Sequence, residues 1–457
     1  MAEHNVTVER TLDMLLSEKK YATIRDILST MNPADIAYVF DELEQERLPL
    51  LFRLLPKELA AEAFVEMEPE AQELLIRGFS DSELREVLDE LYVDDAVDIV
   101  EEMPANVVRR ILSQADPQMR KEINEILRYP ENSAGSIMTT EYVSLRPSMT
   151  VDESILRIRR TGVDKETIYT CYVTKNRTLV GLVTVKDLLL ADNDETTVEE
   201  IMETNVISVN THTDQEEVAR MFSKYDFLAL PVVDNENRMV GIVTFDDAMD
   251  VMEDEVTEDM ELMSGVLPTE KPYLRSGVFE LFLHRIPWLL LLMVSATFTG
   301  LIITGFESAL SAQVVLTAFI PMLMGTGGNS GSQSSVTVIR ALSLGEVDLG
   351  DLWRIVWKEI RTAVLCGIAL SVACFAKLIF IDGMLFGNSA VTVDVALVVS
   401  VTMALTVLAA KVIGCTLPLL AKKLNFDPAV MASPFITTIV DAMSLLVYFG
   451  IANLLLL

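Results

Sequence analysis

The sequence predicts a multi-domain membrane protein with an α-helical superhelical N domain, a tandem pair of α/β modules, an amphipathic connecting helix and an all-α transmembrane domain of five helices. Long apolar segments occupy only the C-terminal part of the 457 residues. The chain holds 68 acidic and 36 basic residues, but from Pro268 onward there are 11 of each. The whole net charge of −32 therefore precedes the apolar segments. Two internal repeats divide this acidic part further.

The charge balance also limits the classes of function. A strongly acidic part repels nucleic acid and attracts counter-cations, although scattered surface acids also serve simple solubility. The first 20 residues hold no apolar stretch of the length that a secretory signal needs. The four cysteines show no metal-ligand or disulfide spacing, and the three histidines are scattered and pair with no nucleophile. We therefore expect no enzyme and no nucleic-acid partner.

The first repeat has a period of 24 residues and predicts the N domain, over residues 1–130. Its units begin at Pro33, Lys57, Asp81 and Ala105. Each unit carries apolar or small residues three, seven and ten positions further on. This spacing predicts helices, and a repeated helical unit predicts a small superhelix.

The second repeat is longer and predicts two α/β modules. Ile137–Thr139 matches Ile201–Glu203, and Val180–Asp187 matches Val240–Asp247. Each unit reads as a helix, two short apolar strands with a turn between them, and a second helix. These units resemble tandem CBS modules, at 131–199 and 200–250.

The resemblance to CBS modules implies a candidate nucleotide site. Such modules hold an adenosine ribose at the strand-to-helix element, which is Thr184–Asp187 here and Thr244–Asp247 in the second unit. A Thr hydroxyl and an Asp carboxylate at a helix start are suited to positioning ribose hydroxyls. Many CBS pairs bind no nucleotide, so the sequence leaves nucleotide binding open.

An amphipathic connecting helix and linker are expected over residues 246–284. Apolar residues recur at spacings of three and four, so one face is apolar; they are Met249, Met252, Val256, Met260 and Met263. The other face carries Asp247, Asp250, Glu253, Asp254, Glu255, Glu258 and Asp259. Charges this dense repel one another, and a divalent ion between them removes that repulsion. The alternative is a solvated acidic helix.

Five segments within 285–457 are long enough to cross a bilayer, which takes about 20 apolar residues. They are Ile286–Gly305, Val314–Leu342, Arg361–Ile381, Val391–Leu420 and Val430–Leu457. The loops after the second and fourth segments carry Lys and Arg, whereas those after the first and third carry none. The positive-inside rule then predicts a multi-pass cell-membrane protein with a cytoplasmic N-terminus and an outside C-terminus. We expect Lys377 to reach the interface, and the sequence leaves Lys411 undecided between pairing and snorkelling.

The second segment has a polar centre, Gly325–Ser335, rich in glycines, hydroxyls and amides. Such a surface does not face lipid, and loosened backbone at this depth is tolerated only where protein or water covers it. Backbone carbonyls with Asn329 and Gln333 would be ligands for a hard cation. Close helix packing through small residues is the alternative.

Asp441 is the most informative residue, because it is an acid inside the otherwise uncharged fifth segment. A carboxylate at membrane depth costs at least a few kcal/mol and persists where it meets water, a partner or an ion. Thr437 lies four residues earlier and shares its helix face. We expect Asp441 to line a cation pathway; the alternative is that a neighbouring hydroxyl or lysine satisfies it.

The whole chain resembles the MgtE family of magnesium channels. The most specific motifs are GTGGNSGSQS in the second segment, GFES at Gly305–Ser308, and Asp427-Pro428 followed fourteen residues on by Asp441. The resemblance implies a homodimer in the bilayer whose pore lies on the two-fold axis. It implies that Asp441 binds hydrated Mg²⁺, with Thr437, Asn329 and Gly328 as further pore residues. The connecting helix would act as a plug, and high cytosolic Mg²⁺ would hold the pore shut.

The resemblance also supplies regulatory and nucleotide residues. The acids expected to bridge regulatory Mg²⁺ are Asp94, Asp95, Asp214, Glu216, Asp226, Asp247, Asp250, Glu255, Glu258 and Asp259. The residues expected to contact ATP are Tyr169, Lys186, Asp187, Phe227 and Pro231. Three positions depart from the family pattern: Ser332 and Ser433 stand where Asn is frequent, and Lys186 stands where an Arg can contact the nucleotide.

We therefore expect a Mg²⁺-selective uptake channel gated shut by cytoplasmic Mg²⁺. An ion-coupled secondary transporter is the runner-up, because broken helices at the midplane are typical of such proteins. A membrane-bound nucleotide sensor without conduction is a third class, but it leaves Asp441 unexplained.

Overall fold

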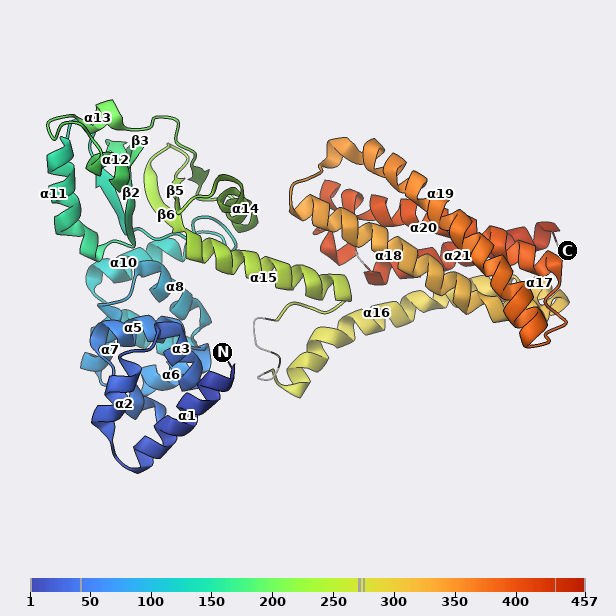
Figure 1. The fold of residues 1–457 in the computed structure, drawn as a ribbon, viewed down its shortest axis with the longest axis horizontal. Helices are drawn as coiled ribbons and strands as arrows, with labels where there is room; N and C mark the ends of the chain where they lie inside the picture. Colours follow the sequence, from blue (N-terminus) through green and yellow to red (C-terminus); the bar gives the residue numbers. More distant parts are fainter. Residues whose placement is uncertain (1, 42, 270–272, 274–275, 432, 456–457) are drawn as a thin grey trace. The chain divides into compact units, whose positions relative to one another are not determined.

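The computed structural model describes residues 2–41, 43–269, 273, 276–431 and 433–455. They form two compact units, Met1–Met252 and Glu253–Leu457 (Figure 1). The boundary between the units falls within helix α15 (Phe245–Ser264).

The N-terminal part of the first unit is a stack of short helices. They are α1 (Ala2–Ser17), α2 (Tyr21–Leu28), α3 (Pro33–Asp41), α4 (Leu48–Phe52), α5 (Lys57–Val65), α6 (Pro69–Gly78), α7 (Asp81–Leu88), α8 (Val93–Glu102), α9 (Ala105–Gln114) and α10 (Pro117–Ile126). Helices α3, α5, α7 and α9 begin at the four residues that start the sequence repeat. Each of them contacts the next, so the period of 24 residues is one turn of a helical stack.

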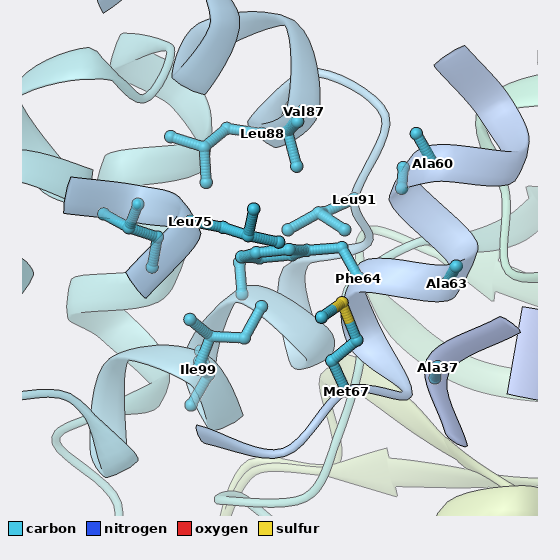
Figure 2. Packing of buried hydrophobic residues seen from close by; sticks show 14 of the residues in the cluster. Ala37, Ala60, Ala63, Phe64, Met67, Leu75, Val87, Leu88, Leu91 and Ile99 are labelled. Atoms are coloured by element: carbon cyan, nitrogen blue, oxygen red, sulfur yellow. The ribbon is translucent and has the colours of Figure 1, made fainter. Parts of the chain in front are cut away.

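The repeat positions form the core of this stack. Phe40, Phe64 and Leu88, seven residues into their units, are each 1% exposed. Figure 2 shows the Phe64 ring enclosed by side chains from several of the 24-residue repeats, among them Leu75 and Leu91. Burial of one such side chain stabilises the fold by roughly 1.5–3 kcal/mol, so a row of them suffices to hold helices that are individually too short to persist.

Two three-stranded sheets follow, with strand orders β1-β2-β3 and β4-β5-β6. In each, the first pair is parallel and the second antiparallel. Their elements are β1 (Tyr142–Leu145), α11 (Val151–Thr161), β2 (Thr167–Lys175), β3 (Thr178–Thr184), α12 (Val185–Leu189), α13 (Val198–Ile201), β4 (Val209–Asn210), α14 (Gln215–Tyr225), β5 (Ala229–Val233) and β6 (Met239–Thr244). Each module thus repeats strand, helix, hairpin and helix.

The matching motifs of the repeat hold the two modules together. Thr139, which lies just before β1, pairs with Ile242 of β6, and Glu203, which precedes β4, pairs with Leu182 of β3. A Cβ on Gly241 would lie 2.6 Å from the Thr139 carbonyl oxygen, and one on Gly181 would lie 2.9 Å from that of Glu203. Because these two positions are glycines, the backbone segment that leads into each module can pack directly against a strand of the other module.

The second unit is helical beyond the end of α15. It comprises α16 (Val278–Gly305), α17 (Glu307–Ala312), α18 (Ile320–Ser343), α19 (Leu352–Ala376), α20 (Val393–Lys423) and α21 (Ser433–Leu455). Short 3₁₀ turns lie at η1 (Gly162–Asp164, in the first unit), η2 (Val314–Phe319), η3 (Leu349–Asp351) and η5 (Ala429–Met431), and η4 (Lys377–Leu385) is a π-helical extension of α19.

Within the described residues, four helical segments are long and apolar enough to cross a membrane. They are Val278–Gly305, Leu349–Leu385, Val393–Lys423 and Ala429–Leu455. Helix α18 has 24 residues and a polar middle, so its hydropathy does not identify it as a span. Helix α18 packs along both α20 and α21, so it lies inside this helical unit. That it crosses the bilayer remains a prediction.

Helix α18 corrects the expectation of loosened backbone in the second segment. It runs as an α-helix without a break from Ile320 to Ser343, so its carbonyls are used within the helix. The small residues serve close packing: a Cβ on Gly414 of α20 would overlap the Gly331 carbonyl oxygen of α18. Such contacts between small residues let helix backbones approach in a membrane, where water does not drive association.

The contact of Gly331 with Gly414 yields a test of this packing. We expect Gly414→Ala to force α18 and α20 apart and to lower the free energy of unfolding by about 1–3 kcal/mol. Thermal unfolding of the full chain in detergent measures the loss. Gly325→Ala is the matched control, because nothing lies within 4 Å of a Cβ at that position. Equal melting temperatures for the two variants would contradict the packing argument.

Candidate functional site

Asp441 and Thr437 lie one turn apart on α21, which packs against α18. Thr437 contacts α18 at Gly328, where a Cβ would lie 3.2 Å from the Thr437 Cγ2. The Thr437 hydroxyl donates to the Pro434 carbonyl oxygen at 3.0 Å. The half-buried Asp441 carboxylate accepts no hydrogen bond and forms no ion pair within the described part of the chain. The alternative of a satisfied carboxylate therefore has no support in these contacts.

The polar side chains of α18 lie on two faces. Asn329 and Gln333, one turn apart, are exposed, whereas Gly328, Ser330 and Ser334 are buried against neighbouring helices. The structure thus brings Gly328 against Thr437, while Asn329 lies on the uncovered side of the same helix. An amide surface in an apolar domain is costly toward lipid, so this side requires water or protein.

Lys411 is buried at 5% exposure and takes part in a network that the sequence did not reveal. Its Nζ donates to the Ser334 Oγ at 3.2 Å, and that hydroxyl donates to the Glu359 Oε2 at 2.6 Å. The three residues come from α20, α18 and α19. Lys411 is therefore held by hydrogen bonding rather than by snorkelling, and Lys377 pairs with Asp382 at 2.6 Å.

The last part of α15 packs within the second unit. Leu262 is buried with Ile339 of α18 and with Ala429, and Asp259 accepts a hydrogen bond from the Ser343 hydroxyl at 3.2 Å. Burial, with a smaller contribution from the Asp427 charge, raises the pKa of Glu258. Two of the expected regulatory acids thus lie where α15 meets the end of α18 and the turn before α21.

The first unit gathers carboxylates from distant parts of the chain. Asp94 and Asp95 stand in the first turn of α8, Glu166 directly precedes β2, and Asp247 lies in the first turn of α15. The backbone N–H of Val93 donates to the Glu141 carboxylate at 3.1 Å, which holds the start of α8 against the first module. These four residues, Asp94, Asp95, Glu166 and Asp247, form the acidic cluster.

The carboxyl groups of the acidic cluster lie where ionisation is unfavourable. Burial, then the Asp247 charge, raises the pKa of Asp94 well above its usual range and that of Asp95 to about 7. Burial, then the Asp95 charge, raises the pKa of Glu166 to about 8, and burial raises that of Asp247 to about 6. Asp94 Oδ1 and Glu166 Oε2 are buried without a hydrogen-bond partner. Such a group is unfavourable when ionised unless protons or cations accompany it.

Of the remaining regulatory acids, Asp250 adds to the acidic cluster, because its charge helps to raise the pKa of Asp247, whereas three others lie at the two ends of α14. Asp214 accepts from the Glu216 backbone N–H at the start of α14, Glu216 pairs with Arg220, and Asp226 ends the same helix with a left-handed backbone. Asp250 and Glu255 lie on α15. Among the described residues, no three His, Cys, Asp or Glu side chains stand in the arrangement of a direct metal site. A hydrated Mg²⁺ needs few direct ligands, because it keeps several waters.

Two of the five expected nucleotide residues, Tyr169 and Lys186, line an apolar slot of about 480 Å³ in the first unit. Leu228 lines it as well, and the Tyr169 side chain is 67% exposed. Asp187 accepts from the Thr184 hydroxyl at 2.5 Å and closes the start of α12. Phe227 lines an adjoining hollow, and Pro231 is buried in β5. A ring exposed beside an apolar slot is suited to stacking on a planar base.

Comparison with known proteins covers the whole chain. The family model described as a divalent cation transporter, MgtE, matches residues 320–451, that of the MgtE intracellular N domain matches 31–132, and the CBS domain matches 134–194 and 198–254. The chain is 39% identical over 453 residues to a magnesium transporter MgtE of Thermus thermophilus, covering 98% of each chain. It is 33% identical over 445 residues to one of Bacillus subtilis, covering 96% of this chain and 95% of that protein.

Among solved structures, the cytosolic domain of a Mg²⁺ channel MgtE in complex with ATP is 41% identical. That structure covers 53% of this chain and 99% of its own, with a TM-score of 0.51. The soluble part of a magnesium transporter is 30% identical with the same TM-score and covers 55% of this chain.

The Lys411 network yields a prediction about stability. We expect Lys411→Met to lower the free energy of unfolding by about 1–3 kcal/mol, because the buried Ser334 hydroxyl loses its charged donor and Glu359 loses the nearby positive charge. Adding Glu359→Gln to that variant restores part of the loss, which a double-mutant cycle of thermal unfolding measures. Lys377→Met is the control, since its partner Asp382 forms a more exposed pair worth about 1 kcal/mol or less. Independent, additive losses would contradict the coupling.

The acidic cluster yields a prediction about pH. In the unfolded chain these carboxyls ionise near pH 4, whereas Asp95, Asp247 and Glu166 keep protons in the fold up to a pH of about 6–8. The folded protein therefore binds more protons, and its stability falls as pH rises through this window. We expect the melting temperature of the full chain in chelator to fall between pH 5 and pH 8, roughly the interval between those pKa values.

Millimolar Mg²⁺ should restore the melting temperature at the upper end of that pH range, because the ion replaces the lost protons. Asp95→Asn should weaken both the pH dependence and the effect of Mg²⁺. Glu62→Gln, which removes an exposed acid of α5, should leave both unchanged. A pH profile that is identical in Asp95→Asn and the parent chain would contradict the assignment.

Proposed function

This chain belongs to the MgtE family of magnesium transporters, and from that premise we propose that it is a Mg²⁺-selective channel for magnesium uptake, gated shut by cytoplasmic Mg²⁺. The observation that carries the proposal is the Asp441 carboxylate, which has no partner within the described part of the chain although it lies on an apolar helix. At membrane depth such a group needs water or a cation. Its neighbour Thr437 contacts α18 at Gly328, so the carboxylate lies close to a helix with a polar, uncovered face.

Conduction in this proposal is passive and uses a homodimer. Two Asp441 carboxylates, one from each copy on a shared axis, attract a divalent ion that keeps part of its water shell, since Mg²⁺ dehydrates reluctantly. The exposed amides of Asn329 and Gln333 support a water-filled pore beside α18. These amides and the Thr437 hydroxyl would provide neutral oxygen ligands for the pore, and Gly328 lets α21 pack close to α18. The N-terminus is cytoplasmic, and the C-terminus lies outside.

Gating rests on the acidic residues of the cytoplasmic part. Without Mg²⁺, the acidic cluster repels itself and favours separation of the helical N domain from the CBS pair. With Mg²⁺, the carboxylates gather, and the connecting region 246–284 holds the pore closed as a plug. Asp214, Glu216, Asp226, Asp250, Glu255, Glu258 and Asp259 would supply further bridging positions for hydrated ions.

The CBS pair would bind an adenine nucleotide. A solved relative, 41% identical, holds ATP in its cytosolic domain. In this chain the slot beside Tyr169 offers an aromatic ring and apolar walls for a base, and Lys186 offers one cation for a phosphate. The Thr184 backbone N–H and hydroxyl both donate to Oδ2 of Asp187, so its Oδ1 can accept from a ribose hydroxyl while the start of α12 stays closed. A lysine makes a point contact where an arginine makes a fork, so we expect modest ATP affinity.

The test is Mg²⁺ flux into reconstituted vesicles under an imposed voltage with no other ion gradient. We expect voltage-driven flux in the parent chain and its loss in Asp441→Ala, since the pore then lacks its charge. Asp394→Asn is the matched control, because Asp394 is an exposed acid in the first turn of α20.

The rival function, an ion-coupled secondary transporter, predicts a different result in the same experiment. Flux would then appear only when a proton or sodium gradient is added. Unchanged flux in Asp441→Ala would remove Asp441 from the ion pathway under either mechanism.

A further inference from the structure

The first CBS module carries a polar cavity of about 830 Å³ that shares no lining residue with the nucleotide slot. It opens beside the turn that joins β2 to β3, between that turn, the loop after β1 and helices α11 and α13. Four cations line it, namely Arg146, Arg157, Lys175 and Arg177. Its volume lies within the range of about 300–1,000 Å³ that is typical of small-molecule sites.

The charge of this cavity is opposite to that of the rest of the chain. The protein has a net charge of −32, yet the lining of this cavity holds four cations and a single carboxylate, Glu199. Within the described residues, none of the four cations forms an ion pair. All four are exposed, so their charge is directed to solvent and to whatever enters the cavity.

Neutral hydrogen-bonding groups complete the lining. Ser144 and Thr174 share a hydrogen bond of 2.9 Å between their hydroxyls, and Ser148 and Asn176 also line the cavity. Only Pro147, Val180 and Met202 are apolar, and no aromatic ring from the described residues lines the cavity. The lining therefore recognises charge and oxygen atoms and offers no stacking surface for a base.

The turn itself favours this interpretation. Asn176 and Arg177 have φ of 53° and 70°, the left-handed backbone of a two-residue hairpin turn. The second position of such a turn suits glycine, and an arginine adopts that conformation at a cost. A glycine at this second position would adopt the turn with less strain, so the hairpin by itself does not explain why arginine stands there. In the second module the corresponding turn carries Asp234 and Glu236, and Arg238 pairs with Glu236.

From the cavity, the unpaired cations and the strained arginine we propose that this site binds a ligand bearing at least two phosphate groups. Arginine forks bind phosphate oxygens by paired, charge-assisted hydrogen bonds, and three of the four cations are arginines. A soluble condensed phosphate and a polyphosphorylated lipid headgroup offer the same chemistry to the cavity. This inference is independent of the proposed channel function, because it uses no pore or gating residue.

The test is calorimetric titration of the full chain in detergent with inorganic tripolyphosphate, in Mg²⁺-free buffer so that the probe is not chelated. We expect saturable binding that weakens with salt. Arg157→Ala and Arg177→Gly should each weaken it about tenfold or more, as expected for the loss of a charged hydrogen-bonded pair. Arg160→Ala, on the same helix but outside the cavity, is the matched control, and Tyr169→Ala reports binding in the nucleotide slot instead.

Arg177→Gly also separates a ligand role from a structural one. Glycine relieves the backbone conformation, so the melting temperature should stay equal or rise while the affinity falls. A second titration with vesicles containing a phosphatidylinositol bisphosphate identifies the source of the phosphates. Binding of these vesicles but not of tripolyphosphate, dependent on Arg157 and Arg177, supports a lipid headgroup. Binding of tripolyphosphate supports a soluble ligand. Absence of binding to both probes, or binding that Arg157→Ala and Arg177→Gly leave unchanged, overturns the proposal.

Discussion

Negative charge held away from water is the constraint on which this protein depends. In the first unit, Asp94, Asp95, Glu166 and Asp247 are gathered closely enough to raise one another's pKa. In the second, Asp441 lies on an apolar helix without a partner among the described residues. A group of buried carboxylates is unfavourable unless protons or cations accompany it. We therefore expect the free energy of unfolding to depend on pH and on cation concentration, as the proposed gating by Mg²⁺ requires.

Small residues and one buried network give the helical unit the rigidity to hold such a charge in place. Gly331 and Gly414 bring α18 and α20 into backbone contact, and Gly328 admits Thr437 of α21. Lys411 then joins the same helices by a polar link through Ser334 to Glu359. Packing and hydrogen bonding thus act on the same helix, α18, from its buried side, and its amides remain exposed on the other.

The fold class and the family could be predicted from the sequence because both depend on short motifs and on residue spacing. The family models and the full-length relatives confirm these two predictions. The period of 24 residues marked the helix starts at Pro33, Lys57, Asp81 and Ala105. The paired glycines and methionines of the α/β repeat lie at the contacts between each module and the segment that leads into the other. Both signals depend on spacing, which a single sequence contains.

What the sequence could not predict depends on contacts between distant residues. Glu166 lies about 70 positions from Asp95 along the chain, so nothing local marks it as part of the acidic cluster. Ser334 and Glu359 resemble ordinary polar residues until Lys411 is placed beside them. The polar run of α18 predicts loosened backbone because its surface cannot face lipid, but in the structure it stays helical and packs against α20 and α21.

Helix α15 begins in the first unit and ends in the second, so the proposed gating would have to act through it. It is continuous over 20 residues, about 30 Å at the rise of an α-helix. Asp247 at its start belongs to the acidic cluster, while Asp259 and Leu262 near its end contact α18. An ion shifts a conformational equilibrium only by the difference in its affinity for the two states. In the proposed gating, gathered carboxylates would bind Mg²⁺ better than separated ones, so the acidic cluster would supply that difference.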